Sequence, residues 1–211
     1  MNPSPIERVA SPPEFGRLLV VLETVDALAY ALAGYAMARA EQIRRARWRD
    51  VDLKLGAVEL GVDLDARKSD AARRVVPAVP PLHALLRRTY LEAGRPDGSE
   101  LLCPPRYRAR KSGLPSRNGL AKRARKRWHA AQLEPITLQE CRHTAATWLD
   151  AAGVSPRIAS YLMGHTTPRR QEGAAPITLA RYTHTLPEDI ERARNQLAAY
   201  LAEAATKEAS G

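Results

Sequence analysis

The chain has 211 residues, with 33 Lys and Arg against 23 Asp and Glu, so its formal net charge is +10. No apolar stretch reaches the ~18 residues that a membrane-spanning helix needs, and two widely separated cysteines, Cys103 and Cys141, exclude a disulfide-stapled scaffold. No signal peptide is visible at the N-terminus and the cysteine content fits a reducing compartment, so we expect a cytoplasmic protein with no membrane association. The positive charge favours a polyanionic partner, nucleic acid first.

The N-terminal part of the chain shows two helical patterns. Residues 1–11 contain Pro and Ser, and we expect a disordered arm there. Ser11 is a suitable N-cap for a helix that has Pro in its first turn, and the buried face of this helix is apolar: Phe15, Leu18, Leu19 and Leu22. A second helix, rich in Ala and Leu, is predicted from Asp26 to about Arg45.

Two β-like runs follow, at residues 58–64 and 72–79, and a polar connection over 65–70 joins them. This pattern predicts a small antiparallel hairpin. Pro80-Pro81 ends the second strand and opens a helix that Gly94 stops.

The C-terminal half is predicted to be helical. The expected helices cover 120–131, 136–152 and 155–163, and a last helix begins at Pro187. The fold class is therefore mainly α with a small antiparallel β-sheet (α+β). We expect one domain over residues 12–202 and a flexible tail over 203–211.

The positive charge is concentrated between residues 106 and 127, where ten basic residues occur without one acid. They are Arg106, Arg108, Arg110, Lys111, Arg117, Lys122, Arg123, Arg125, Lys126 and Arg127. A solvated loop and helix face is the alternative, but such helices normally interleave both signs of charge. We therefore predict that this basic run binds phosphates. The run alone would also fit an RNA-binding protein.

Three motifs in the C-terminal half occur in a characteristic order. Residues 138–149 read Leu-Gln-Glu-Cys-Arg-His-Thr-Ala-Ala-Thr-Trp-Leu, residues 161–165 read Tyr-Leu-Met-Gly-His, and residues 180–184 read Ala-Arg-Tyr-Thr-His. This order resembles the catalytic domain of the tyrosine recombinases, the phage integrase family. That family has a His-x-x-Arg-His-Thr helix, a Leu-Gly-His turn and a Tyr-Thr-His nucleophile segment.

Two upstream motifs extend the resemblance to roughly residues 12–200. Arg39 lies nine residues before Trp48, which begins the sequence Trp-Arg-Asp-Val-Asp, and this is similar to the first arginine box of the family. Lys68, in the polar connection after a strand, matches the hairpin lysine of the family. Its identity is the least secure, because Arg67, Arg73 and Arg74 lie nearby.

The resemblance implies a site-specific recombinase that cleaves and rejoins DNA strands through a 3′-phosphotyrosyl intermediate, with no metal or other cofactor. Arginine forks suit the two non-bridging oxygens of a phosphodiester, and a positioned lysine can protonate the departing 5′-oxygen. The implied roles are a phosphate clamp from Arg39 and Arg142, a general acid in Lys68, a phosphate contact from His165 and a nucleophile in Tyr182.

Each of these residues also has a structural interpretation. Alone, Arg39 would be a helix-surface residue and Lys68 a solubilising hairpin residue. His165 after a glycine could simply cap the preceding helix, and Tyr182 could be half-buried core. His143 is expected to buttress the site rather than react.

The sequence departs from the family at three points. Gln139 occupies the position of the family's first histidine, and an amide can donate and accept hydrogen bonds but cannot act as a base. Gln42 stands where the first box usually has an acid, with Glu41 one residue earlier. The 17-residue step from His165 to Tyr182 is longer than usual, and we expect a flexible loop there.

Only about a dozen residues precede the first expected helix, so we expect this chain to lack the N-terminal core-binding domain of the family. The expected partner is double-stranded DNA, with self-association as a tetramer on it. The apolar stripe Ile190, Leu197 and Leu201 of the last helix could dock on a neighbouring copy, or it could pack on its own core. The alternative function is a catalytically impaired integrase remnant, encoded by a phage or mobile element, that only binds DNA.

Overall fold

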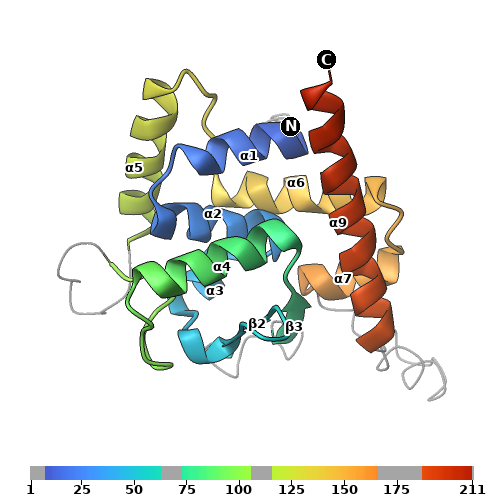
Figure 1. Cartoon of the computed structure of the whole chain (residues 1–211), viewed down its shortest axis with the longest axis horizontal. Coiled ribbons are helices and arrows are strands. Elements are labelled where there is room, and N and C mark those ends of the chain that lie inside the picture. Colours follow the sequence, from blue (N-terminus) through green and yellow to red (C-terminus); the bar gives the residue numbers. More distant parts are fainter. Residues whose placement is uncertain (1–7, 63–72, 106–115, 166–186, 211) are drawn as a thin grey trace, which may run out of the picture.

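The structure is a computed structural model that describes residues 8–62, 73–105, 116–165 and 187–210. Helices α1, α2, α4 and α6 lie roughly side by side, the small sheet lies below them, and α9 crosses their ends (Figure 1). The predicted class, mainly α with a small antiparallel sheet, is confirmed. The described elements are α1 (Pro12–Val20), α2 (Thr24–Tyr35), α3 (Ala40–Arg45), η1 (Trp48–Asp50), β1 (Val51–Asp52), β2 (Ala57–Leu60), β3 (Arg74–Pro77), α4 (Pro80–Glu92), α5 (Arg117–Ala130), α6 (Leu138–Ala151), α7 (Pro156–Met163) and α9 (Pro187–Ala209).

The end of the N-terminal arm is bound to the domain. Ala10 is completely buried; its N–H donates to Thr144 Oγ1 (3.2 Å) and its carbonyl accepts from Trp148 Nε1 (3.1 Å). The prediction of a disordered arm over 1–11 is therefore wrong for residues 8–11, because α6 supplies hydrogen-bonding partners that the arm's own sequence does not reveal. Residues 1–7 lie outside the described residues. Ser11 caps α1 as predicted, in a reciprocal capping box with Glu14.

The helix predicted over 26–45 is two helices, α2 and α3, separated at residues 36–39. Met37 lies in the left-handed region (φ 51°), which ends α2. Nearly every residue of α2 is buried, with the helix enclosed mainly by α4 and α6. Because α2 is apolar on all sides, it has no polar face whose loss would mark the end of the helix. The apolar sequence pattern therefore continues across the break between α2 and α3.

The sheet has the order β1-β2-β3, with all neighbours antiparallel and with Val58 opposite both Val51 and Val76. Each strand of the predicted hairpin is four residues long, shorter than the β-like runs at 58–64 and 72–79. The two-residue strand β1 was not predicted. Asp52 accepts hydrogen bonds from the N–H groups of Lys54 and Leu55 and so shapes the turn into β2.

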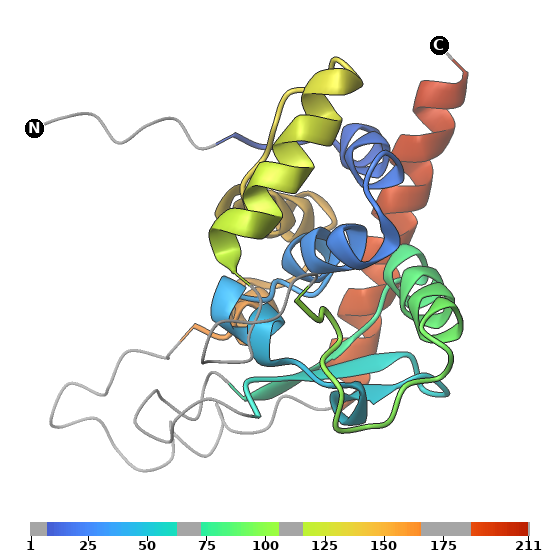
Figure 2. The same ribbon diagram turned by 90° about the vertical axis from the view of Figure 1, so that its left-hand side faces the viewer.

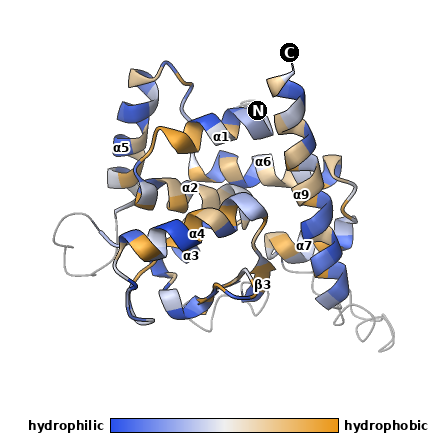
Figure 3. Cartoon of the chain, in the orientation of Figure 1, coloured by the Kyte–Doolittle hydropathy of each residue, from blue (hydrophilic) through white to orange (hydrophobic). Residues whose placement is uncertain are grey.

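Helices α5 and α9 lie on opposite sides of the α1–α2 layer (Figures 1 and 2). Helix α9 buries Ala193, Leu197 and Leu201 and contacts α1 and α6. Its first turns, which lie furthest from α1, are hydrophilic (Figure 3). The helix continues to Ala209, so residues 203–209, where the sequence predicts a flexible tail, are helical. None of the described helices is long and apolar enough to cross a membrane.

Candidate active site

Arg39 stands at the start of α3, immediately after the break that ends α2. Its side chain is exposed and one guanidinium nitrogen donates to the carbonyl of Gly164 (2.8 Å). Its backbone N–H donates to Gln42 Oε1 (2.9 Å), and Gln42 is 2% exposed. The glutamine that replaces the family's acid thus fixes the backbone that carries Arg39. Glu41 forms ion pairs with Arg44 and Arg45.

Arg142 lies in the second turn of α6 and is 8% exposed. Its guanidinium donates to the carbonyls of Met37 and Met163. These two carbonyls belong to the α2–α3 break and to the end of α7, so Arg142 connects the segments that carry Arg39 and His165. Gln139 is exposed one turn earlier on α6, three residues before Arg142, which places both on neighbouring positions of the helix surface.

His165 follows the left-handed residue Gly164 (φ 58°) that closes α7. Its N–H donates to the Ser160 carbonyl (3.1 Å), the pattern of a Schellman cap, and its side chain is exposed. The capping interpretation is therefore confirmed, and the functional role of the His165 side chain stays a prediction. Partial burial and the cations of Arg142, Arg39 and Arg74 lower the pKa of His165. The lowered pKa favours the neutral ring, which has one N–H donor and one acceptor nitrogen.

Arg74 is a member of this cluster that the sequence analysis did not assign. It begins β3, is 3% exposed, and donates to the carbonyls of Leu162 (2.7 Å) and Met37 (3.1 Å). Burial, together with the charges of Arg142 and Arg39, lowers its pKa to about 9. Burial and Arg39 lower the pKa of Arg142 to about 10. The available signal was the two-residue period of the strand, which puts Arg74 on the same face as the buried Val76.

The cluster gathers three guanidinium groups and an imidazole around the carbonyls of residue 37 and of residues 162–164. The described side-chain hydrogen bonds of Arg39 and Arg142 go to backbone carbonyls, which carry no formal charge to balance theirs. Such a concentration of positive charge favours a bound anion, and guanidinium forks match the geometry of a phosphate. Lys68 and Tyr182 lie outside the described residues.

The Trp48 motif has a structural role. Trp48 is buried and packs edge-on against Tyr90, with the ring centroids 5.2 Å apart. The Asp50 carboxylate accepts the N–H of Arg47 (2.8 Å) and so closes the turn of η1. These contacts hold the loop that leads from α3 into the sheet.

The basic run over residues 106–127 contains residues outside the described part of the chain, exposed residues and residues in ion pairs. Arg106, Arg108, Arg110 and Lys111 lie outside the described residues, and Arg117 is the first residue of α5. Lys122, Arg125 and Lys126 are exposed on α5. Arg123 forms a bidentate ion pair with the buried Asp26 (2.8 and 2.6 Å), and Arg127 pairs with Glu23 (2.8 Å). The last two thus attach α5 to α2 and to the turn before it.

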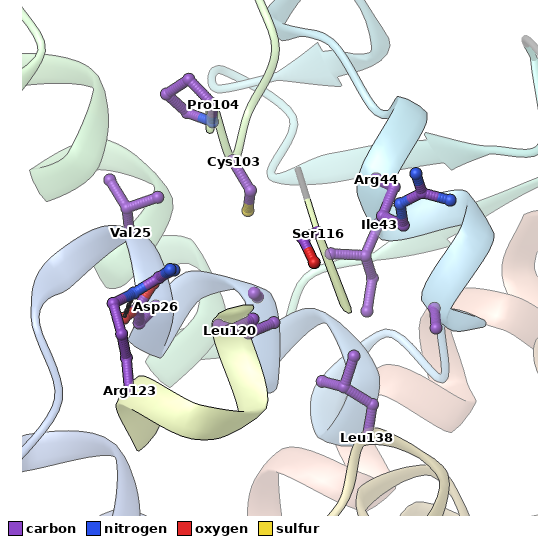
Figure 4. Close-up of a pocket in the computed structure, with 12 residues that line it drawn as sticks. Val25, Asp26, Ile43, Arg44, Cys103, Pro104, Ser116, Leu120, Arg123 and Leu138 are labelled. Atoms are coloured by element: carbon purple, nitrogen blue, oxygen red, sulfur yellow. Dashed lines mark hydrogen bonds and ion pairs between the residues drawn. The ribbon is translucent and has the colours of Figure 1, made fainter. Parts of the chain in front are cut away.

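A cleft between α2, α3 and α5 is lined by Ile43, Cys103 and the Asp26–Arg123 pair, among others (Figure 4). The space open to a water-sized sphere is about 30 Å³, room for only one or two water molecules. Among the described residues no group of His, Cys, Asp and Glu is arranged to hold a metal ion. This cleft is therefore a weaker candidate for the functional site than the arginine cluster.

The phage integrase family model matches residues 12–188. The chain belongs to the phage integrase family. No curated protein matches its sequence. Solved integrases and recombinases share its fold: the integrase from mycobacterium phage Brujita (TM-score 0.62, 19% identity), XerA recombinase (0.61, 20%) and the Tn1549 transposon integrase in complex with circular intermediate DNA (0.58, 18%).

This member of the integrase family matches a part of those longer proteins. The alignments cover 94%, 93% and 93% of this chain but 66%, 65% and 69% of the respective structures. The family match spans Arg39, Gln139, Arg142 and His165, the four predicted catalytic residues that the structure describes. The structure brings Arg39, Arg142 and His165 to one place and adds Arg74 to them.

Proposed function

We propose that this chain is the strand-cleaving and rejoining domain of a site-specific DNA recombinase that works through a 3′-phosphotyrosyl intermediate. The observation that carries the proposal is the convergence of Arg39 and Arg142 on adjacent carbonyls, with His165 beside them. Three separate segments, at α3, α6 and the end of α7, contribute one group each, and together these groups can surround a single phosphate.

The buried setting strengthens the interaction with phosphate. Arg142 is desolvated and fixed by two carbonyls, so its remaining N–H donors are already oriented before the anion arrives. The exposed guanidinium of Arg39 is held by one described carbonyl contact and reaches the same region from solvent. Together they would neutralise the charge that builds on the two non-bridging oxygens during attack. The neutral ring of His165 can donate one further hydrogen bond.

The covalent step needs a nucleophile and an acid. In the proposed reaction the Tyr182 hydroxyl gives its proton to solvent water and its oxygen attacks the scissile phosphorus, so that a P–O bond to tyrosine forms and the bond to the 5′-oxygen breaks. Lys68 gives its proton to that oxygen, and reversal of the steps rejoins the strand. The undescribed segments that contain these residues are joined to the described chain near Arg74 and His165, which supports their participation at this cluster.

DNA is the proposed partner. The exposed cations of α5, Lys122, Arg125 and Lys126, would contact the duplex backbone, with the remaining basic residues of the run extending that surface. Self-association on DNA is proposed as well. Among the structural neighbours, a lambda integrase fragment is described as a dimer bound to a COC′ core site (TM-score 0.55, 15% identity).

The decisive experiment uses a nicked suicide DNA substrate, which traps the covalent intermediate because the released fragment diffuses away. We expect a protein–DNA adduct on a denaturing gel, and we expect Tyr182→Phe to abolish it. An adduct formed by Tyr182→Phe would show that another residue is the nucleophile. No adduct with the unmodified chain at any salt concentration would overturn the catalytic proposal for this chain.

A second candidate function rests on Gln139, which occupies the histidine position of the family motif beside Arg142. If the amide limits proton transfer, the chain would bind DNA without efficient cleavage. Gln139→His should then raise the rate of adduct formation while leaving DNA affinity unchanged. An unchanged rate would show that the glutamine does not limit the reaction.

A further inference from the structure

Arg74 has contacts that ordinary strand residues do not have. Its neighbour Arg73 is exposed and pairs with Glu59 (2.7 Å), as surface residues of a hairpin commonly do. Arg74 instead buries its guanidinium and donates Nε to the Leu162 carbonyl and a terminal nitrogen to the Met37 carbonyl. The two residues therefore make a matched pair: the same side chain stands at adjacent positions, Arg73 just before β3 and Arg74 at its start, but with opposite surroundings.

The two carbonyls that Arg74 binds belong to the segments that present the phosphate-binding groups. The Met37 carbonyl also accepts from Arg142, and it lies two residues before Arg39. The Leu162 carbonyl lies in the last turn of α7, just before the carbonyls of Met163 and Gly164 that accept from Arg142 and Arg39. Arg74 thus links the α2–α3 break to the α7 end from the side of the sheet.

The break itself needs such support. Met37 is a non-glycine residue with a φ of 51°, a conformation that the rest of the structure must hold in place. Its carbonyl accepts from two guanidinium groups, one on α6 and one on β3. Placing a third arginine in a buried cluster of like charge is unfavourable, and a well-packed apolar residue often serves stability as well or better. A stability role alone therefore does not account for a charged residue here.

We propose that Arg74 is a positioning residue for the phosphate site: it sets the distance between the α2–α3 break and the α7 end, and thereby the relative placement of Arg39, Arg142 and His165. This inference rests on the proposed function for its catalytic consequence. Arg74 acts through the Met37 and Leu162 carbonyls and does not itself touch the phosphate. The strand β3 thus joins the active site to the small sheet.

The test compares Arg74→Met, Arg74→Lys and the matched surface variant Arg73→Met in the full chain. Cleavage of the suicide substrate is measured in single turnover at saturating DNA, and DNA affinity is measured separately. Misplacement of about 1 Å can lower a rate by about 10²-fold, so we expect about that loss for Arg74→Met with nearly unchanged affinity. Arg74→Lys should retain more activity than Arg74→Met, because one ammonium can reach one of the two carbonyls. Arg73→Met should react like the unmodified chain.

The results separate this proposal from the proposed function. An unchanged cleavage rate in Arg74→Met, or equal losses in Arg74→Met and Arg73→Met, would overturn the positioning role. If the unmodified chain forms no adduct, the proposed function fails, and the positioning role is then tested in the free protein by NMR of the Arg142 Nη–H groups, which donate to the Met37 and Met163 carbonyls. We expect faster hydrogen exchange there in both Arg74 variants and no change in Arg73→Met. Should Arg74→Met fail to fold, the same comparison with Arg74→Lys decides the matter.

Discussion

The pKa of His165 depends on the charges that surround its imidazole ring. Burial and the neighbouring cations of Arg142, Arg39 and Arg74 lower its pKa in the free protein. A bound phosphate adds the opposite charge, which favours the protonated ring, so we expect the pKa of His165 to rise when nicked duplex DNA binds. NMR titration of the imidazole signals, with and without DNA, measures the change. The signals of His83, whose ring contacts the Leu53 carbonyl, serve as the control.

The same shift has a consequence for stability. The folded-state pKa of His165 lies below the unfolded value of about 6.5, so the unfolded chain binds a proton more readily. The contribution of His165 to the free energy of unfolding is therefore fully present above the unfolded-state pKa of about 6.5 and is lost as the pH falls through the folded-state pKa. His165→Asn should reduce this acid sensitivity in urea unfolding measured at pH 5 and pH 8. In the NMR titration described above, a pKa of His165 that falls on DNA binding would contradict the placement of phosphate in this cluster.

Some residues of the candidate site could be predicted from sequence motifs and others could not. The order of the motifs was enough to predict that Arg39, Arg142 and His165 meet, because each residue carries a recognisable neighbourhood. Arg74 was visible only as one of several basic residues near Lys68. Its role depends on burial and on two carbonyls distant in sequence, and neither property is encoded in local spacing.

At the scale of elements, α5 presents two kinds of basic residue. Arg123 satisfies the buried carboxylate of Asp26, whereas Arg125 is exposed. Arg123→Met leaves that carboxylate buried without its partner, so we expect the free energy of unfolding to fall by about 3 kcal/mol. Arg125→Met should change it by less than about 0.5 kcal/mol. Chemical denaturation measures both variants, and equal effects would show that the ion pair does not hold α5.

The exposed residues of α5 should behave in the opposite way. Replacing Lys122, Arg125 and Lys126 together by Ala removes three proposed phosphate contacts. DNA affinity should fall, and the slope of log K against log salt should become shallower by roughly three. Fluorescence anisotropy titrations over a range of salt concentrations measure the slope, and thermal unfolding checks that the fold is retained. A weaker affinity with an unchanged slope would argue against phosphate contacts on this helix.

Elements with a clear start signal were predictable from sequence. Ser11 and Thr137 cap α1 and α6 with their side chains, and proline opens α4 and α7. The α2–α3 break was missed because residues 27–38 form an uncharged, mainly apolar run across the end of α2, and because the carbonyl of Met37 is satisfied by Arg142 and Arg74. That partner set exists only in the folded chain, so a tertiary contact decides where the helix ends.

For the whole molecule, the net charge of +10 is distributed less simply than the basic run suggests. Arg123 and Arg127 are engaged with Asp26 and Glu23, while Arg39, Arg74 and Arg142 form a second positive centre outside that run. The described residues thus present a cationic helix face and a partly buried cationic site. The first suits sequence-independent attraction to a duplex, and the second suits one particular phosphate.

The C-terminal helix α9 packs its apolar stripe on the rest of the same chain. Leu197 and Leu201 of α9 are buried within the same chain, and Arg17 of α1 pairs with Glu208 near the helix end. Of the two interpretations of this stripe, packing on its own core describes the free chain. Self-association through α9 would then need an exposed face of the helix, or its release from this core.

Leu197→Ala distinguishes a helix packed on its own domain from one donated to a neighbouring copy. Truncating a buried leucine leaves a cavity, so we expect the free energy of unfolding to fall by about 2–5 kcal/mol. Because the helix packs on its own chain, the melting temperature should be independent of protein concentration in both the variant and the unmodified protein. A melting temperature that rises with concentration, and that loses this dependence in Leu197→Ala, would show that α9 stabilises an oligomer instead. Ala202→Ser, at an exposed position on the same helix, is the control and should leave both quantities unchanged.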